Sequence, residues 1–458
     1  NKGAAALYRQ ALVHLEALGL EAHWQTAVRI YAARAEVLHL LGQLTQAAES
    51  TNQALQLGQS RGTPDHTWPL FNLLADIRLA QGQYTAVWSL TEQVVRESGG
   101  YDLAWALYLR GMAAVRQMDG ARAVENLAQA AALCADALCI GVLTTQALAE
   151  DMAGRQETAL AGMATAVSQA RQAEASLELA QTLHWQSVVL LRAGRPEEAL
   201  GAAEEAVTLL NGISPNLLAH ALTQRAAVFI YQGQAGAAAA DLQLAADLLE
   251  GMEDVPGLAA VYLLWGYEYG RIAPDSDASR RRLERAKLLL GEYLDEGVFS
   301  AARIRLYLGL SRTALREGQI DDARLWLAQV VVLDQADEAV WWRPSVWYLW
   351  GETALAAGDR RYARELFSEA LTAVHEGGCP DELPLILLQL ARLTAKRDAH
   401  RLRFFEAAVA AAHERSRFPD KVVCFKEAGK VLSGVGDGRL RRIGEGCLAW
   451  VAEREVGE

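Results

Sequence analysis

Hydrophobic and polar positions follow a helical period along this chain, and the helical pattern itself recurs about every 40 residues. Within each period, apolar residues at i, i+3, i+4 and i+7 place one apolar stripe along a helix. Each 40-residue unit contains two such segments, and a turn separates them. No segment shows the strict alternation of apolar and polar residues that is typical of a half-buried strand. The pattern therefore predicts an all-α protein built from antiparallel helix pairs.

The turn between the two segments has its own signature. A glycine is followed five residues later by alanine, then four residues further by a medium or large residue and three beyond that by a small one. A glycine suits the end of a helix because a left-handed backbone costs it little. The clearest sets are Gly42/Ala47/Thr51/Ala54, Gly154/Ala159/Met163/Ala166, Gly194/Ala199/Ala203/Ala206, Gly233/Ala238/Leu242/Ala245 and Gly358/Ala363/Phe367/Ala370. Looser sets begin at Gly82, Met118, Pro274 and Gly318.

A second signature precedes each turn. A small residue lies seven positions before it, and a larger one usually lies eleven positions before it. Small residues that face each other allow two helices to cross closely. The small residues are Ala35, Ala75, Gly111, Ala147, Ser187, Ala226, Ser311 and Gly351. The larger residues are Tyr31, Phe71, Leu107, Leu143, Leu183, Leu222, Leu263, Tyr307 and Trp347.

These two signatures together resemble the tetratricopeptide repeat (TPR), and the matches cover nearly the whole chain. The resemblance implies an all-α, right-handed solenoid of about eleven antiparallel helix pairs, which forms a single array over residues 1–458. Residues 395–458 are its degenerate, basic C-terminal repeats or cap. Ala4, Tyr8 and Ala11 match a second helix that lacks its first, which indicates a sequence cut from a longer one. HEAT repeats share the 40-residue period, but the Gly-x-x-x-x-Ala turn favours the TPR.

The period of about 40 residues exceeds the 34 of the standard TPR. Longer repeats of this kind resemble the sensor arms of bacterial signal-transduction ATPases of the STAND type. The resemblance implies a cytoplasmic, non-enzymatic arm that is covalently linked to an upstream switch domain. Such an arm binds a protein, a peptide or a small inducer in its concave groove, and the ligand favours one curvature of the array. The alternative is a free-standing TPR scaffold that assembles protein complexes.

The stretch from Val340 to Trp350 is rich in tryptophan, and the repeat register assigns these side chains. Trp347 occupies the large core position of its repeat and Trp350 a neighbouring one, so both are expected between helices. Trp341 and Trp342 are expected to cover the junction with the preceding repeat. Tyr348 falls one residue after the core position, on the face that lines the groove in TPR-like arrays.

The same register, applied to every repeat, predicts which residues line the groove. The residue types there suit binding, because Tyr, Trp and Arg are enriched in interaction hot spots; solvated surface positions are the alternative. The register gives Arg29, Glu36, His39, Asn72, Asp76, Gln181, His220 and Thr223. The candidate contacts are Trp105, Tyr108, Met112, His184, Glu268, Arg271, Arg305, Arg312, Tyr348 and Glu352.

The net charge, the apolar runs and the motifs of the sequence argue against several classes of function. The 458-residue chain has a net charge of −12, which argues against binding to nucleic acids or anionic membranes. No apolar run approaches the ~20 residues of a membrane span. No phosphate-binding GxxxxGK[ST] loop and no HExxH or GxSxG motif occurs, so no cofactor, metal or catalytic residue is predicted. Five cysteines without a CxxC pair predict reduced thiols, and Cys134 and Cys139 are not spaced to share a helix face.

Two regions are rich in positively charged residues, although the chain as a whole is acidic. Arg280, Arg281, Arg282, Arg285 and Lys287 lie on one predicted helix. Residues 396–442 carry twelve Lys and Arg against six Asp and Glu, a difference of +6. Docking to an acidic surface is one interpretation of this charge, and a solvated surface of the last repeats is the other.

Overall fold

The computed structural model describes residues 2–18, 23–61, 67–117, 119–273, 275–291, 300–334, 342–376, 380–396, 398–414 and 417–455. Met118, Pro274 and Trp341, to which the sequence signatures assign positions, lie outside these ranges, as does Cys379. The chain divides into two compact units. The first comprises residues 1–226, 240–261 and 288–299, and the second comprises residues 227–239, 262–287 and 300–458. Throughout the described ranges the regular structure is helical, which confirms the all-α prediction.

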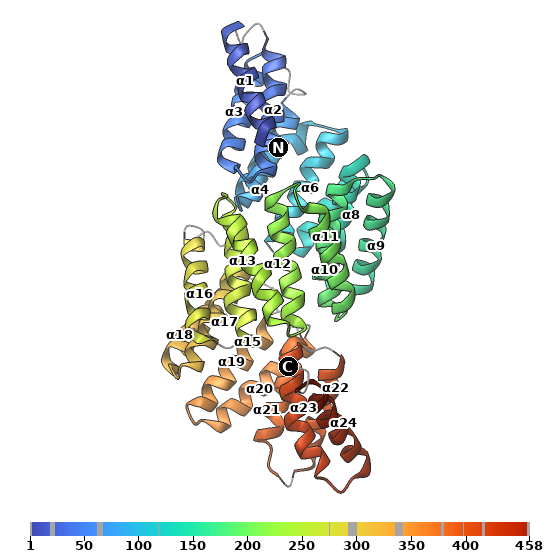
Figure 1. Ribbon diagram of the computed structural model, residues 1–458, viewed down its shortest axis with the longest axis vertical. Coiled ribbons are helices and arrows are strands. Elements are labelled where there is room, and N and C mark those ends of the chain that lie inside the picture. Colours follow the sequence, from blue (N-terminus) through green and yellow to red (C-terminus); the bar gives the residue numbers. More distant parts are fainter. Residues whose placement is uncertain are drawn as a thin grey trace. The chain divides into compact units, whose positions relative to one another are not determined.

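The first unit consists of helices that follow one another as antiparallel neighbours (Figure 1). They are α1 (Lys2–Leu18), α2 (Trp24–Leu40), α3 (Leu44–Arg61), α4 (Trp68–Ala80), α5 (Tyr84–Glu97), α6 (Gly100–Arg116), α7 (Gly120–Ala131), α8 (Asp136–Met152), α9 (Gln156–Gln172), α10 (Ser176–Arg192) and α11 (Pro196–Leu210). Residues of α12 (Pro215–Tyr231), α13 (Ala235–Glu250) and α14 (Val255–Leu263) belong partly to each unit.

The second unit continues the same alternation (Figure 1). Its elements are the π-helical turn η2 (Leu264–Glu268), α15 (Tyr269–Ile272), most of α16 (Ser276–Leu290), α17 (Ser300–Arg316), α18 (Ile320–Asp334), α19 (Arg343–Ala356), α20 (Arg360–His375), the 3-10 turn η4 (Pro380–Glu382), α21 (Leu383–Leu393), α22 (Ala399–Glu414), α23 (Phe418–Ser433) and α24 (Gly438–Glu455). Counted from α2, the described helices form eleven consecutive pairs, as the sequence predicts.

The predicted glycine turns are present. Gly42, Gly154 and Gly358 each follow the first helix of a pair with φ of 73°, 77° and 85°. In each case the next residue's N–H donates to a carbonyl five residues earlier, for example Gln43 to Leu38 and Asp359 to Ala354. This bond closes the helix end, and it requires the left-handed residue that glycine supplies at little cost.

Small residues mark the crossing of the two helices in a pair, as predicted. A Cβ added to Gly111 of α6 would lie 2.5 Å from Cγ of Leu127 on α7. One added to Gly351 of α19 would lie 2.6 Å from the ring of Phe367 on α20. The alanines five residues after the turn glycines, such as Ala47 and Ala159, are completely buried. The core of each pair is therefore a seam of large residues inserted against small ones.

The tryptophan-rich segment belongs mainly to this core. Trp342 is 2% exposed. Trp347 and Trp350 are partly buried and pack against the core around Phe367, with their ring centroids 6.3 Å apart. The prediction that they pack between helices is confirmed, although neither ring is completely enclosed.

The helices of the first unit form two layers. Each first helix of a pair contacts the first helix of the next pair, along α2, α4, α6, α8 and α10. The second helices α3, α5, α7 and α9 approach one another less closely. Because the first helices are the closer-packed layer, the stack curves toward them and they form its inner face.

A contact within the first unit joins turns that are far apart in sequence. The Glu253 N–H donates to the Gly42 carbonyl at 3.3 Å, and Ser214 Oγ donates to the Leu40 carbonyl across 174 residues. Met252 packs so closely on Gly42 that an added Cβ would lie 2.9 Å from its sulfur. The turn between α2 and α3 is thus held by the turns that precede α12 and α14.

The π-helical turn η2 interrupts the first helix of its pair. A π turn accommodates one extra residue and rotates the remainder of the helix. Gly266 and Gly270 let α16 approach, because Cβ atoms there would lie 2.6 Å from Leu283 and 2.7 Å from Ser279 Oγ. The guanidinium of Arg282 lies 4.2 Å from the ring centre of Trp265, against this turn. Tyr267 and Glu268 lie in this turn, and Arg271 follows it in α15.

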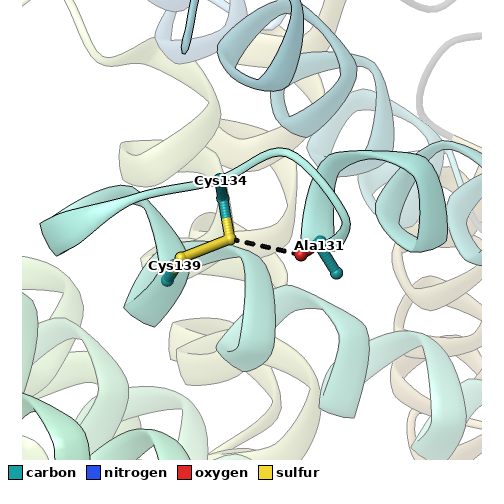
Figure 2. The surroundings of a disulfide bond; sticks show 3 residues. All are labelled: Ala131, Cys134 and Cys139. Carbon is teal, nitrogen blue, oxygen red and sulfur yellow. Dashed lines mark hydrogen bonds between the residues drawn. A yellow bond between two sulfur atoms is a disulfide. The ribbon is translucent and has the colours of Figure 1, made fainter. Parts of the chain in front are cut away.

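The prediction of reduced thiols is wrong for one pair of cysteines. Cys134 and Cys139 form a disulfide bond, with their Cα atoms 5.2 Å apart (Figure 2). Cys134 lies in the connection after α7, and Cys139 lies in the first turn of α8. The spacing argument assumed one continuous helix, whereas the turn between the residues brings the two sulfur atoms together. Cys424 and Cys447 are free and buried.

Candidate functional site

The inner face of the first unit carries a carboxylate that is accessible and yet poorly solvated. Asp76 on α4 lies 3.6 Å from His39 Nδ1 on α2, and its side chain remains 35% accessible. Burial nevertheless raises its pKa, and the neighbouring His39 only partly opposes this. Burial also raises the pKa of Glu36, the equivalent residue one repeat earlier. Protein therefore surrounds both carboxylates, although a ligand can still reach them.

Tyr108 and Met112 lie on α6, and Tyr108 interacts electrostatically with Asp76. Burial and the neighbouring Asp76 together raise the pKa of Tyr108 to about 12, although Thr145 and Arg116 partly oppose them. Thr145 of α8 hydrogen-bonds the Tyr108 side chain and also donates to Met112 Sδ at 3.0 Å. Gly141 of α8 leaves room for the phenol, since a Cβ there would lie 3.2 Å from its oxygen. The structure thus places two of the candidate contacts, Tyr108 and Met112, against the same Thr145 hydroxyl.

His184 on α10 is a neutral imidazole in the same layer of helices. Burial, with smaller contributions from His220 and Arg116, lowers its pKa to about 3. Its Nδ1 atom is enclosed and has no hydrogen-bond partner among the described residues. His220 instead pairs with Asp254, Nε2 to Oδ2 at 2.8 Å. His184 is therefore an uncharged side chain whose Nδ1 has unused hydrogen-bonding capacity.

Aromatic and cationic groups complete this face. Trp105 on α6 is partly buried and packs against cores that include Ile77 and Leu109. Arg116, at the end of α6, is exposed and lies 5.2 Å from the ring centre of Trp185 on α10. We call Glu36, Asp76, Trp105, Tyr108, Met112, Arg116 and His184 the first-unit inner face.

In the second unit, three of the candidate contacts join a buried cluster of ion pairs. Arg271 Nη2 lies 2.7 Å from Asp420 Oδ2, and its Nη1 lies 3.2 Å from Glu382 Oε1. Arg312 Nη2 lies 3.9 Å from the same Glu382 oxygen. The Arg271 side chain is 6% exposed and that of Glu382 is 2% exposed. These groups are paired with each other and are not open to solvent.

A third arginine extends the cluster. Arg417 Nη2 donates to Asp381 Oδ2 at 2.9 Å and to Glu268 Oε1 at 3.3 Å. The guanidinium of Arg312 also lies 4.7 Å from the ring centre of Tyr267. We define the ion-pair cluster as Arg271, Arg312, Arg417, Glu268, Asp381, Glu382 and Asp420.

The ion pairs outweigh the cost of burial at the centre of the cluster. Burial alone would raise the pKa of Glu382, but Arg271, Arg417 and Arg312 hold it below its usual range. Burial alone would likewise lower the pKa of Arg271, but Asp420 and Glu382 raise it. Both groups are therefore charged, and removing one partner would leave a buried charge uncompensated.

Tyr348 and Glu352 form a second polar group on α19. Burial raises the pKa of Glu352, and Tyr348 hydrogen-bonds its carboxylate. Gln389 of α21 donates to Glu352 Oε1 at 2.5 Å and accepts from Arg392 Nη1 at 3.1 Å. The ring of Tyr348 packs against Phe367, with centroids 5.7 Å apart. Both residues therefore have a place in the packing, whether or not they also contact a ligand.

Of the ten candidates, Arg305 is an exposed residue of α17. The sequence register missed Asp381, Glu382, Arg417 and Asp420, because it considered only the inner positions of first helices. These four residues lie at the starts of α21 and α23. Both starts combine proline with acidic residues, as Pro380-Asp-Glu-Leu-Pro and Phe-Pro-Asp420. That combination predicts a helix start. It does not predict which basic side chain pairs with the acidic residue.

Some of the cations after residue 395 contact acidic or aromatic side chains. Arg439 contacts Glu406, and Lys421 lies 5.6 Å from the ring centre of Trp450. Arg417 belongs to the ion-pair cluster. On the predicted basic helix α16, Arg280 contacts Glu317 and Arg282 stacks on Trp265. These contacts account for several of the cations as part of the packing between helices.

An open hollow of about 460 Å³ lies on α9 and α10, lined by Ala164, Val167, Ser168, Arg171, Gln172 and Gln186. Its only charged lining residue, Arg171, already binds Glu205 at 2.7 Å. The hollow contains none of the candidate contacts and offers no convergent polar groups. In the described ranges, His, Cys, Asp and Glu do not gather in a metal-binding group. No described helix is long and apolar enough to cross a membrane.

Comparison with known proteins supports the fold. A Rap protein complexed with competence and sporulation factor aligns with a TM-score of 0.55 and 13% identity, over 76% of this chain and 99% of that one. A tetratricopeptide repeat protein from Parabacteroides merdae (TM-score 0.40, 18% identity, 63% and 98% of the two chains) and yeast Tom70 (0.40, 14%, 93% and 96%) are also similar. No protein-family model and no curated protein matches the chain. With its repeat geometry, the chain is an α-solenoid of TPR-like helix pairs.

Proposed function

We propose that this chain is a non-enzymatic binding array that takes a protein or peptide segment on the first-unit inner face. The observation that carries this proposal is Asp76, which is 35% accessible although its surroundings raise its pKa. A carboxylate in that state gains from a cationic or hydrogen-bonding ligand, because bulk water solvates it poorly. Trp105, Tyr108 and Arg116 lie on the same face and belong to the residue types that contribute most to interaction hot spots.

We further propose that the array is the sensor arm of a larger bacterial regulator, in the cytoplasm. Its ligand, a protein segment or a small inducer, would favour one curvature of the stack and so bias a covalently linked switch domain. The long repeat period supports this role, because it resembles the arms of signal-transduction ATPases. The Rap protein of similar fold was solved as a complex with competence and sporulation factor, so this fold is compatible with such binding.

Selection of a displayed random peptide library on the purified chain tests the binding proposal. We expect selected peptides to lose about tenfold or more in affinity when Trp105→Ala or Tyr108→Ala is introduced, since hot-spot truncations cost about 1–4 kcal/mol. Tyr362→Ala is the matched control, because Tyr362 is an exposed aromatic residue of the second helix α20. Equal losses for Tyr108→Ala and Tyr362→Ala would overturn the proposed location. Tyr348→Ala measures in the same assay whether the second unit contributes.

The alternative is a free-standing scaffold for protein assembly, which the same fold supports. Sequencing the gene on both sides of the region that encodes this chain separates the two roles. A phosphate-binding loop followed by a helical linker upstream would support the sensor arm. A start codon within one helix of Asn1 would instead leave the scaffold as the function.

A further inference from the structure

The ion-pair cluster joins elements that are distant in sequence. Glu268 and Arg271 come from η2 and α15, and Arg312 comes from α17. Their partners come from the starts of α21 and α23, so that Arg271 and Asp420 are 149 residues apart. The cluster therefore links the first helices of the second unit to its last two helix pairs, α21/α22 and α23/α24.

This link is made by long side chains. The α15 and α23 backbones do not pack along each other, whereas neighbouring helices such as α23 and α24 pack extensively. Arg271 spans the space, with one nitrogen on Asp420 and the other on Glu382. Arg417 makes a second connection from the start of α23 to Glu268. Charged hydrogen bonds of this kind depend strongly on geometry, so a small displacement of α23 breaks several of them together.

The helix pairs that these bonds hold have a core of their own. Phe405, Phe425, Leu432 and Val451 are buried together with Leu388 and Cys447, all within α21–α24. Such a core allows α21–α24 to stay folded when the ion pairs separate. Ile386 and Leu390 of α21 also pack into the core around Phe367, so α21 is anchored on α19 and α20 independently of the cluster. The cluster is therefore a set of discrete contacts that can separate while both cores remain packed, which is the arrangement of a two-state element.

We propose that the ion-pair cluster is a releasable latch. It holds the starts of α21 and α23 against η2, α15 and α17. Its opening uncovers Arg271, Arg312 and Tyr267 for the acidic groups of a partner. In the closed state, Glu382 and Asp420 occupy the position that such acidic groups would take. The partner half of this inference rests on the proposed binding function, whereas the latch itself does not.

Hydrogen exchange of the full chain with Asp420→Asn tests the latch. Losing the charge that faces Arg271 should speed exchange of amides in 264–272, 380–383 and 417–424 by about ten- to a hundredfold. The cores of α19/α20 and of the first unit should keep their protection. Asp437→Asn is the matched control, because Asp437 stands at the start of α24 and accepts from Arg439 and Leu440 amides outside the cluster. Arg271→Lys keeps the charge but loses the forked contact, so it should give an intermediate effect.

Two results would overturn the latch. Unchanged exchange in the Asp420→Asn variant would show that the ion pairs do not restrain the helices they connect. Equal acceleration over the whole second unit would show that the cluster is part of one cooperative core.

Binding of a fluorescent hexaglutamate peptide tests the partner half. The peptide should bind the Asp420→Asn variant at least about tenfold more tightly than the unaltered chain. Adding Arg312→Ala to that variant should remove the gain. If the Asp420→Asn variant exchanges faster but binds the peptide no more tightly, the proposal of an acidic partner is wrong, while the proposal that the cluster can open still stands. Neither measurement involves the first-unit inner face, so a failure of the binding site proposed there can be distinguished from a failure of the latch.

Discussion

Single glycines decide how closely two helices of a pair approach. Gly111 and Gly201 both lie inside helices, but their surroundings differ. A Cβ on Gly111 would collide with Leu127, whereas one on Gly201 would meet no atom within 4 Å. The two positions separate the cost of steric overlap from the general preference of helices for alanine.

We expect Gly111→Ala to lower the free energy of unfolding by about 1–3 kcal/mol, because α6 and α7 must move apart. Gly201→Ala should leave it unchanged or raise it by up to about 1 kcal/mol, because alanine is the better helix former. Urea denaturation of both variants checks this. A loss of similar size in both would contradict the close crossing of α6 and α7.

His184 makes stability depend on pH. Its folded-state pKa of about 3 lies below its usual value of 6.5, because the buried ring excludes the proton. Between these values the unfolded chain binds a proton that the folded chain does not, so stability falls as the pH drops below about 6.5.

His184→Gln should flatten this part of the stability curve when unfolding is followed in urea between pH 7 and pH 4. The exposed His375 provides the control His375→Gln, which should follow the unaltered chain. Identical pH slopes for all three proteins would contradict the buried, neutral state of His184.

At the scale of the element, the turn glycines and the small crossing residues allowed the helix pairs to be predicted from sequence. Both are local requirements of backbone and packing. The ion-pair cluster was not predictable in the same way, although Glu268, Arg271 and Arg312 were singled out. Their partners Glu382 and Asp420 come from helix starts far along the chain, so no local sequence pattern links the two sets of residues. The π turn at Leu264–Glu268 also has no counterpart in the repeat pattern.

The disulfide after α7 gives an element-scale prediction. It closes a very short loop, since Cys134 and Cys139 are five residues apart. Cys139→Ala should therefore cost at most about 2 kcal/mol in unfolding free energy by the loop-entropy relation. Hydrogen exchange should rise locally at 132–140. A peptide digest without reductant checks the bond directly, and a mass of two free thiols in the folded protein would contradict it.

At the scale of the first unit, the contact between Gly42 and Met252 lets a substitution in one helix pair destabilise a turn that is distant in sequence. In an open repeat array each helix pair senses only its neighbours. Here Met252→Ala should loosen a turn that lies about 200 residues earlier in the chain. We expect amides 38–47 to exchange faster, and a loss of about 1–2 kcal/mol for a partly buried methionine. Leu244→Ala, at an exposed position on α13, is the control.

The same contact sets a rule for how this protein can change over evolution. Open arrays lengthen or shorten by whole repeats, because any new repeat finds the same neighbours. Between Gly42 and Met252, however, adding or deleting one helix pair would rotate and shift one end past the other. Met252 would then meet a different turn, and Glu253 would lose the Gly42 carbonyl. The number of repeats in this stretch is therefore fixed by the contact.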